Sequence, residues 1–289
     1  MPFALLPLKA GFWIWRAFCL IVAACLLRAA RVNWKVVGLG LASPAAWYDF
    51  ANGQNGTLTG TILLVALLSA RRRPIMAGVC AGVLTIKPHL GLPIVIAAIR
   101  LRGWKLIGCA SLIALGLAAV ASILWGKEAW VWFFGTAQHD EWAWTAQSFK
   151  TAFPGAGTTT YFMARSFGFS DFEASIAQAV SAVLALALIW RLWKPGFMAE
   201  LPCVIITVCL NVWVVPHGYM YDLVAFSTAM AFLMVGLTGW ACFAAALLWL
   251  MAGYTGVIAI VATHMLLFPL CAAAGAYLAW HVRHEPALR

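Results

Sequence analysis

Residues 57–105 read TLTGTILLVALLSARRRPIMAGVCAGVLTIKPHLGLPIVIAAIRLRGWK. Apolar runs in this stretch are divided first by arginines at 71–73 and then by Pro88 and Pro93. A helix needs roughly 17–25 apolar residues to cross about 30 Å of hydrocarbon, and proline interrupts the helical hydrogen bonds. The stretch therefore predicts membrane helices, and it predicts that 74–99 consists of two half-depth segments meeting at a break.

The composition of the whole chain agrees with this. Of its 289 residues, 64% are hydrophobic and 10% are charged, and the mean hydropathy is +0.92. Soluble domains are about 45–50% apolar and about 25% charged, so a soluble globular protein and a disordered chain are both excluded. Eight cysteines are too few for a disulfide scaffold. The apolar runs are continuous rather than alternating, which argues against an outer-membrane barrel.

The expected fold is therefore all-α: a polytopic transmembrane helical bundle forming a single domain over 1–289. We predict about 9–11 membrane segments, at roughly 10–30, 36–50, 57–70, 74–87, 88–99, 104–125, 173–193, 198–215, 222–238, 240–260 and 263–281. The stretch 126–172 is predicted to be a long extracytoplasmic loop. Its first half is rich in tryptophan, which is typical of an interfacial helix or of an aromatic belt at the membrane surface.

The basic residues behind the net charge of +10 are unevenly distributed between the two predicted sides of the membrane. If the predicted segments alternate in direction, 13 of the 19 basic residues fall on one side, in connections holding Arg28, Arg31, Lys35, Arg71, Arg72, Arg73, Arg100, Arg102, Lys105, Arg191, Lys194, Arg283 and Arg289. Basic residues collect on the cytoplasmic side, so nucleic acid is not an expected partner. The same alternation starts Met1 outside, and we therefore expect one or more earlier spans to be missing from this chain.

Polar residues gather on the opposite, extracytoplasmic side. Gln54 and Asn55 lie between glycines in 47–56 and offer amide groups suited to sugar hydroxyls, although the segment also fits a plain turn. Lys87 ends an apolar stretch at the predicted break, where an ammonium group and freed backbone groups suit a phosphate. The alternative for Lys87 is a side chain that reaches to the lipid headgroups.

Two further segments carry candidates on that side. Lys150 and Arg165 flank a Gly/Thr run in the long loop, and loops of this length tend to be functional or disordered. His217, Tyr221 and Asp222 lie within six residues at a helix entry. Asp222 also fits a helix cap.

Sequence motifs that are typical of several common enzyme activities are absent from the chain. The chain has no G-x-x-x-x-G-K-[ST] phosphate loop, no H-E-x-x-H and no G-x-S-x-G. We expect no metal and no cofactor, and the cysteines, which lie within apolar spans, fit small packing residues.

The order of these motifs resembles glycosyltransferase family 87, whose members are polytopic GT-C enzymes that include polyprenyl-phosphate-mannose-dependent α-mannosyltransferases. The resemblance rests on the stretch 52–105, with Gly53-Gln54-Asn55-Gly56, the arginine cluster, and Lys87-Pro88. The segment 216–222 is similar to the family's Pro-Tyr…Tyr-Asp-Leu stretch, with His217 replacing an aromatic residue. Lys150 and Arg165 look like the family's Lys…Arg pair.

The resemblance implies an inverting, metal-independent hexosyltransferase in the inner (plasma) membrane, with its active face extracytoplasmic. A hexose, most simply mannose, would move from a polyprenyl-phosphate sugar to a lipid or glycan acceptor. The implied donor-phosphate ligands are Lys87, Lys150 and Arg165. The implied sugar or acceptor ligands are Gln54, Asn55, His217, Tyr221 and Asp222, with Asp222 orienting a partner or capping its helix.

The family's catalytic Asp has no counterpart in this chain. Met1–Pro7 resembles the sequence that follows the loop carrying it, so the catalytic Asp is expected upstream of Met1 and the chain alone would be inactive. Two alternatives from other classes remain: a transporter or flippase of a lipid-linked sugar, and a non-catalytic membrane subunit. A charged path to the cytoplasmic side would favour transport.

Overall fold

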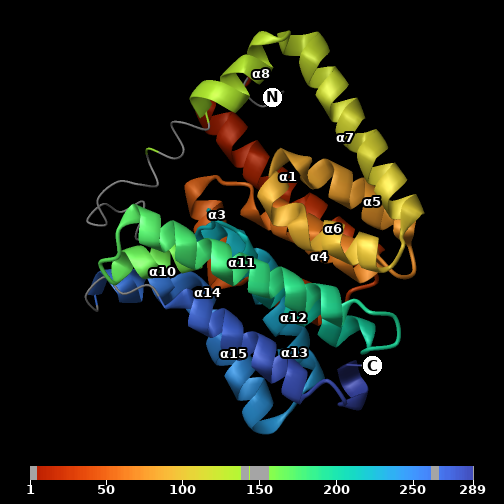
Figure 1. Ribbon diagram of the computed structural model, residues 1–289, viewed down its shortest axis with the longest axis vertical. Coiled ribbons are helices and arrows are strands. Elements are labelled where there is room, and N and C mark those ends of the chain that lie inside the picture. Colours follow the sequence, from red (N-terminus) through yellow and green to blue (C-terminus); the bar gives the residue numbers. More distant parts are fainter. Residues whose placement is uncertain (1–4, 138–142, 144–155, 262–266, 289) are drawn as a thin grey trace.

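The computed structural model describes residues 5–137, 143, 156–261 and 267–288, which form helices joined by short connections (Figure 1). The α-helices used below are α1 (Leu8–Ala29), α2 (Trp34–Leu41), α3 (Pro44–Asn52), α4 (Gly56–Ser69), α5 (Pro74–Val83), α6 (Leu92–Arg100), α7 (Trp104–Trp125), α8 (Glu128–Trp132), α10 (Thr160–Ser166), α11 (Asp171–Leu192), α12 (Glu200–Val214), α13 (Val224–Gly236), α14 (Gly239–Val261) and α15 (Phe268–His281). The predicted all-α polytopic membrane fold is confirmed.

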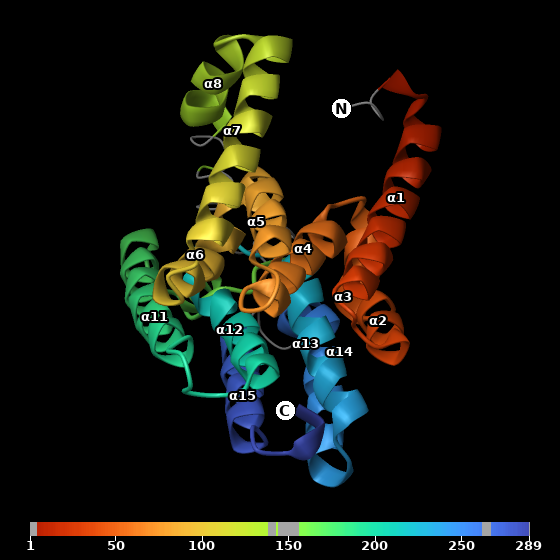
Figure 2. The same cartoon turned by 90° about the vertical axis from the view of Figure 1, so that its right-hand side faces the viewer.

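Length and hydropathy divide the helices into two kinds. In the described part of the chain, α1, α7 and α11 are each 22 residues long and apolar enough to cross a membrane. The others are mostly shorter apolar helices, among them α4 and α12. Buried residues occupy 13 of the 14 positions of α4, so this helix is central, whereas α7 buries only Leu106 and rises from the rest of the bundle (Figure 2).

The break predicted within 74–99 is present. Helix α5 continues into a 3-10 turn, η2 (Leu84–Ile86), and a second 3-10 turn, η3 (Pro88–Gly91), leads into α6. Lys87 joins the two turns with φ −133° and ψ 72°, outside the helical region. Proline at the first position of η3 explains the stop, because the residue before proline is disfavoured in the helical conformation.

The predicted span over 36–50 is wrong as one continuous segment. The chain forms two short helices, α2 and α3, divided at Ala42 and Ser43. The Ser43 hydroxyl oxygen accepts a hydrogen bond from the backbone N–H of Ala46 at 3.2 Å, and Pro44 occupies the first turn of α3. A serine cap followed by proline is a helix start signal. The prediction missed this signal because it lies within an apolar run.

The arginine-bearing connections meet at one end of the bundle, here called the arginine end (residues 28–35, 71–73, 100–105 and 191–200). Arg71 donates to the carbonyl of Met198 at 3.0 Å, and Arg73 donates to that of Ala29 at 2.7 Å. Arg72 pairs with Glu200 at 3.1 Å. Three of the connections that the sequence placed together are thus in contact.

Helices α5 and α7 approach closely through glycine. A Cβ on Gly78 would lie 2.6 Å from Cβ of Cys109, and one on Gly82 would lie 2.5 Å from Cβ of Ile113. Two small residues four positions apart allow such close packing between membrane helices. This pair holds α7 against the bundle.

We therefore expect Gly78→Ala to destabilise the purified protein in detergent by about 1–3 kcal/mol, as overpacking does, with a lower Tm. The matched control is Gly108→Ala on α7, where an added Cβ meets no atom within 4 Å. Helix propensity alone favours alanine at both sites. A Gly78→Ala protein as stable as the control would contradict this packing.

Candidate functional site

The opposite end of the bundle gathers polar groups from four parts of the chain and is here called the polar end (residues 47–57, 84–91, 156–171 and 216–223). Its first element is the turn between α3 and α4. Gly53 has φ +63°, a conformation that favours glycine. Asp49, only 2% exposed, then accepts hydrogen bonds from the backbone N–H of Gly56 at 2.7 Å and of Thr57 at 2.9 Å.

Asp49 is therefore the cap of α4. Its Oδ2 also accepts from the Thr57 hydroxyl at 2.6 Å. A carboxylate on the first backbone N–H groups of a helix satisfies donors that have no partner within the helix and complements the helix dipole. These bonds fix the turn on which Gln54 and Asn55 lie.

The two predicted sugar ligands on this turn differ in setting. Gln54 is exposed, and Asn55 is half-buried. The Asn55 side-chain oxygen is buried without a hydrogen-bond partner among the described residues. Buried acceptors are normally bonded, so the Asn55 oxygen has an unused acceptor, whereas Gln54 is open to solvent.

The turn also touches the 216–223 segment. A Cβ on Gly56 would lie 1.8 Å from the backbone oxygen of Tyr221, so only glycine permits this approach. Tyr221 belongs to a 3-10 turn, η6 (Met220–Leu223), that begins α13. This close approach places the α3–α4 turn directly against η6.

Lys87 and Asp222 form an ion pair at this junction. The Lys87 Nζ lies 2.5 Å from Oδ1 of Asp222, with side chains 18% and 6% exposed. Oδ2 of the same carboxylate accepts from the backbone N–H of Tyr219 at 3.2 Å, and Nζ lies 4.8 Å from the centroid of the Tyr221 ring. Asp222 thus caps η6 and holds Lys87 in place, which joins the two roles that the sequence left open.

The end of the long loop is attached to the same segment. Thr158 donates its backbone N–H to the carbonyl of Gly218 at 2.9 Å, and the Thr159 hydroxyl donates to that of Pro216 at 3.2 Å. Gly157 forms an isolated β-bridge with Tyr219. Lys150 itself lies outside the described residues.

Tyr161 is a polar residue that the sequence did not single out. Its hydroxyl donates to Oδ1 of Asp171 at 2.5 Å, and its backbone N–H donates to Oε1 of Gln178 at 3.0 Å. Burial, followed by the bond to Asp171, raises the pKa of the Tyr161 phenol, which keeps it a proton donor. Its ring lies 6.4 Å, centroid to centroid, from that of His217.

Arg165 lies beside Tyr161 rather than beside the ion pair of Lys87 and Asp222. Its Nη1 donates to the carbonyl of Phe169 at 3.0 Å, and its charge acts on Tyr161. The structure therefore brings Lys87, Tyr221 and Asp222 together, and it places Arg165 beside Tyr161. Hydrogen bonds between residues 10–17 apart, such as those of Tyr161, leave no pattern in the sequence.

Arg16 of α1 also supports this end. Its Nη2 donates to the carbonyl of Ala51 at 2.6 Å. Its guanidinium carbon lies 3.5 Å from the ring centroid of Phe12 and 4.6 Å from that of Phe50. Cation–π contacts of this kind tie α1 to the end of α3.

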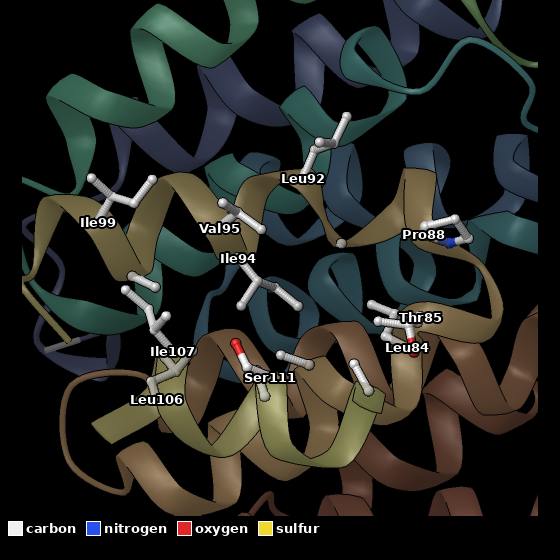
Figure 3. A pocket seen from close by; sticks show the side chains of 15 residues that line it. Leu84, Thr85, Pro88, Leu92, Ile94, Val95, Ile99, Leu106, Ile107 and Ser111 are labelled. Carbon is white, nitrogen blue, oxygen red and sulfur yellow. The ribbon is translucent and has the colours of Figure 1, made fainter. Parts of the chain in front are cut away.

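An apolar groove of about 430 Å³ lies at the helix break. It runs between the broken segment and α7, and its lining includes Thr85, Pro88, Ile94 and Ile107 (Figure 3). Its walls are almost entirely aliphatic, so they suit a hydrocarbon chain. Among the described residues, no three His, Cys, Asp or Glu side chains lie close enough to hold a metal ion.

The ion pair can be tested by a double-mutant cycle. Either Lys87→Met or Asp222→Asn alone leaves one largely buried charge, and we expect each to cost up to about 3 kcal/mol of stability. The double variant should cost clearly less than the sum of the single variants. The free energy of unfolding of all four proteins is measured in detergent, with circular dichroism as the signal. Strictly additive losses of stability would exclude the pairing.

Comparison with known proteins adds the family. No curated protein and no solved structure is significantly similar to the chain. The model of glycosyltransferase family 87 matches residues 1–235, which include the α3–α4 turn, the break at Lys87 and the segment 216–223. This match, over most of the chain, shows that the protein belongs to glycosyltransferase family 87.

Proposed function

We propose that this glycosyltransferase moves a hexose, most simply mannose, from a polyprenyl-phosphate sugar to a lipid or glycan acceptor. The observation that carries the proposal is the position of Lys87, a cation at a helix break whose chain neighbour Pro88 lines an apolar groove. A polyprenyl phosphate has the matching form, an anionic head on a long hydrocarbon chain. A lipid-borne donor also needs no soluble nucleotide-sugar domain.

The chemistry assigns roles to the polar end. The acceptor oxygen attacks the anomeric carbon, the bond from that carbon to the phosphate oxygen breaks, and a base takes the acceptor proton. Negative charge then develops on the leaving phosphate, where positioned cations stabilise it. Lys87 supplies one cation, while Lys150 and Arg165 are proposed as the others.

The base is not assigned to Asp49 or to Asp222. Asp49 is committed to three hydrogen bonds from Gly56 and Thr57, and Asp222 is committed to Lys87 and Tyr219. Gln54, Asn55, His217 and Tyr221 are proposed contacts for the sugar or the acceptor.

The proposed orientation puts the arginine end on the cytoplasmic side of the inner membrane and the polar end on the outer side. Support comes from the meeting of the arginine-bearing connections at one end of the bundle. Basic connections of membrane proteins are retained in the cytoplasm. Transfer would then take place on the extracytoplasmic face.

Lys87→Ala tests the phosphate role. In membranes containing the full-length protein and labelled polyprenyl-phosphate mannose, we expect kcat/KM to fall about 10²–10³-fold, the cost of removing one group that stabilises developing charge. Lys194→Ala, an exposed cation at the arginine end, is the matched control and should leave transfer unchanged. Movement of the labelled lipid across vesicles without sugar transfer would instead favour a transporter.

The groove makes a separate prediction about the donor chain. Ala114 lines the groove, and Ala114→Phe should narrow it and raise KM for a long-chain donor more than for a short-chain one. Leu115→Phe, at an exposed neighbouring position of α7 that does not line the groove, is the control. Equal effects of the two variants on both donors would show that the groove does not hold the chain.

A further inference from the structure

A second cavity lies at the arginine end, away from the proposed transfer site. It has a volume of about 450 Å³ and lies between the α4–α5 and α6–α7 connections. Three cations line it, Arg71, Arg102 and Lys105, together with Trp104, and no acidic residue does. Like charges converge on one space only at a cost, so the cavity favours an anion.

Arg71 gives the strongest indication of a ligand. Its Nη1 donates to Met198 and its guanidinium lies over the Trp193 ring, 5.3 Å from the centroid. Its Nε and Nη2 are buried, and neither has a hydrogen-bond partner in the part of the chain that the structure describes. Buried guanidinium donors need acceptors, and phosphate oxygens match their fork geometry.

The nearest carboxylate does not remove this need. Glu200 interacts electrostatically with Arg71, but its Oε2 pairs with Arg72, whose side chain is 82% exposed, and its Oε1 forms no hydrogen bond with Arg71. Arg102 and Lys105 are exposed at the cavity, and neither side chain forms an ion pair within the described ranges. The cavity therefore keeps a positive charge that the protein does not neutralise.

Two helix starts add to that charge. α5 begins at Pro74 and α7 at Trp104, beside the cavity; neither has a side-chain cap or an acidic residue in its first turn. Helix N-termini carry partial positive charge. Trp104 is 75% exposed, as expected for a tryptophan at a membrane interface.

We propose that this cavity binds the phosphate group of an anionic phospholipid from the leaflet at the arginine end. The ligand is a lipid rather than free phosphate because the cavity opens next to an exposed interfacial tryptophan and beside α7, whose apolar surface faces outward. Basic pockets between membrane helices on the cytoplasmic side are typical sites for anionic headgroups. The site is separate from the polar end and does not depend on the transfer reaction.

The test is a lipid titration of the full-length protein in detergent, with Tm as the readout. Phosphatidylglycerol should raise Tm, and phosphatidylcholine should not. In the double variant Arg102→Gln/Lys105→Gln, the phosphatidylglycerol concentration for half the effect should rise roughly thirtyfold, because each substitution removes one cation that attracts the headgroup. Tm without lipid should change little, because both side chains are exposed.

The chain offers a close control in Arg31→Gln/Lys35→Gln. Arg31 and Arg102 both have positive φ, both precede a Trp-Lys pair within three residues, and the control removes the same charge at the same end without touching the cavity. It should titrate like the unmodified protein. Equal losses in both variants would show a diffuse surface effect, and an equal response to inorganic phosphate would show a free-anion site; either result overturns the proposal.

Discussion

The ion pair between Lys87 and Asp222 joins two parts of the chain that are 135 residues apart. One is the helix break at the end of η2, and the other is η6, the 3-10 turn that starts α13. Two other polar elements of this end attach to the same place: the α3–α4 turn through Gly56, and the end of the long loop through Thr158. A mostly buried lysine needs a partner of opposite charge. The ion pair therefore fixes the position of the helix break against η6.

The two ends of the bundle use charge in different ways. At the arginine end, guanidinium groups mostly bond to backbone carbonyls of neighbouring connections, such as Met198 and Ala29, so the cations hold the connections together while the net charge stays positive. At the polar end, Lys87 is paired with Asp222, and Asp49 accepts hydrogen bonds from the start of α4. The first arrangement suits an anionic membrane surface, and the second fixes the geometry of the polar end.

The sequence predicted the features that depend on local chemistry. Hydropathy located the helices, and Pro88 located the break, because proline acts on its own neighbours in the chain. The division between α2 and α3 was missed, since its signal, Ser43 before Pro44, lay inside an apolar run. The partnership of Lys87 with Asp222 and the bonds of Tyr161 could not be predicted, because they depend on how separate helices pack. The role of Asp49 as the cap of α4 likewise needs the fold of the turn.

The ion pair also constrains the proposed chemistry. Together Lys87 and Asp222 carry no net charge, so at a distance they attract a phosphate only weakly. The Lys87 ammonium has three donors, and Asp222 accepts one of them; a phosphate can therefore bind at close range without breaking the pair. Long-range attraction must then come from other cations. Arg165 lies beside Tyr161, whose ring neighbours His217 at the start of the segment that carries Asp222, and this places a second positive charge on the same side of the bundle. The polar end thus combines a neutral ion pair with a second cation, and in the proposed reaction the pair would fix where the phosphate stops while the cation would favour its arrival.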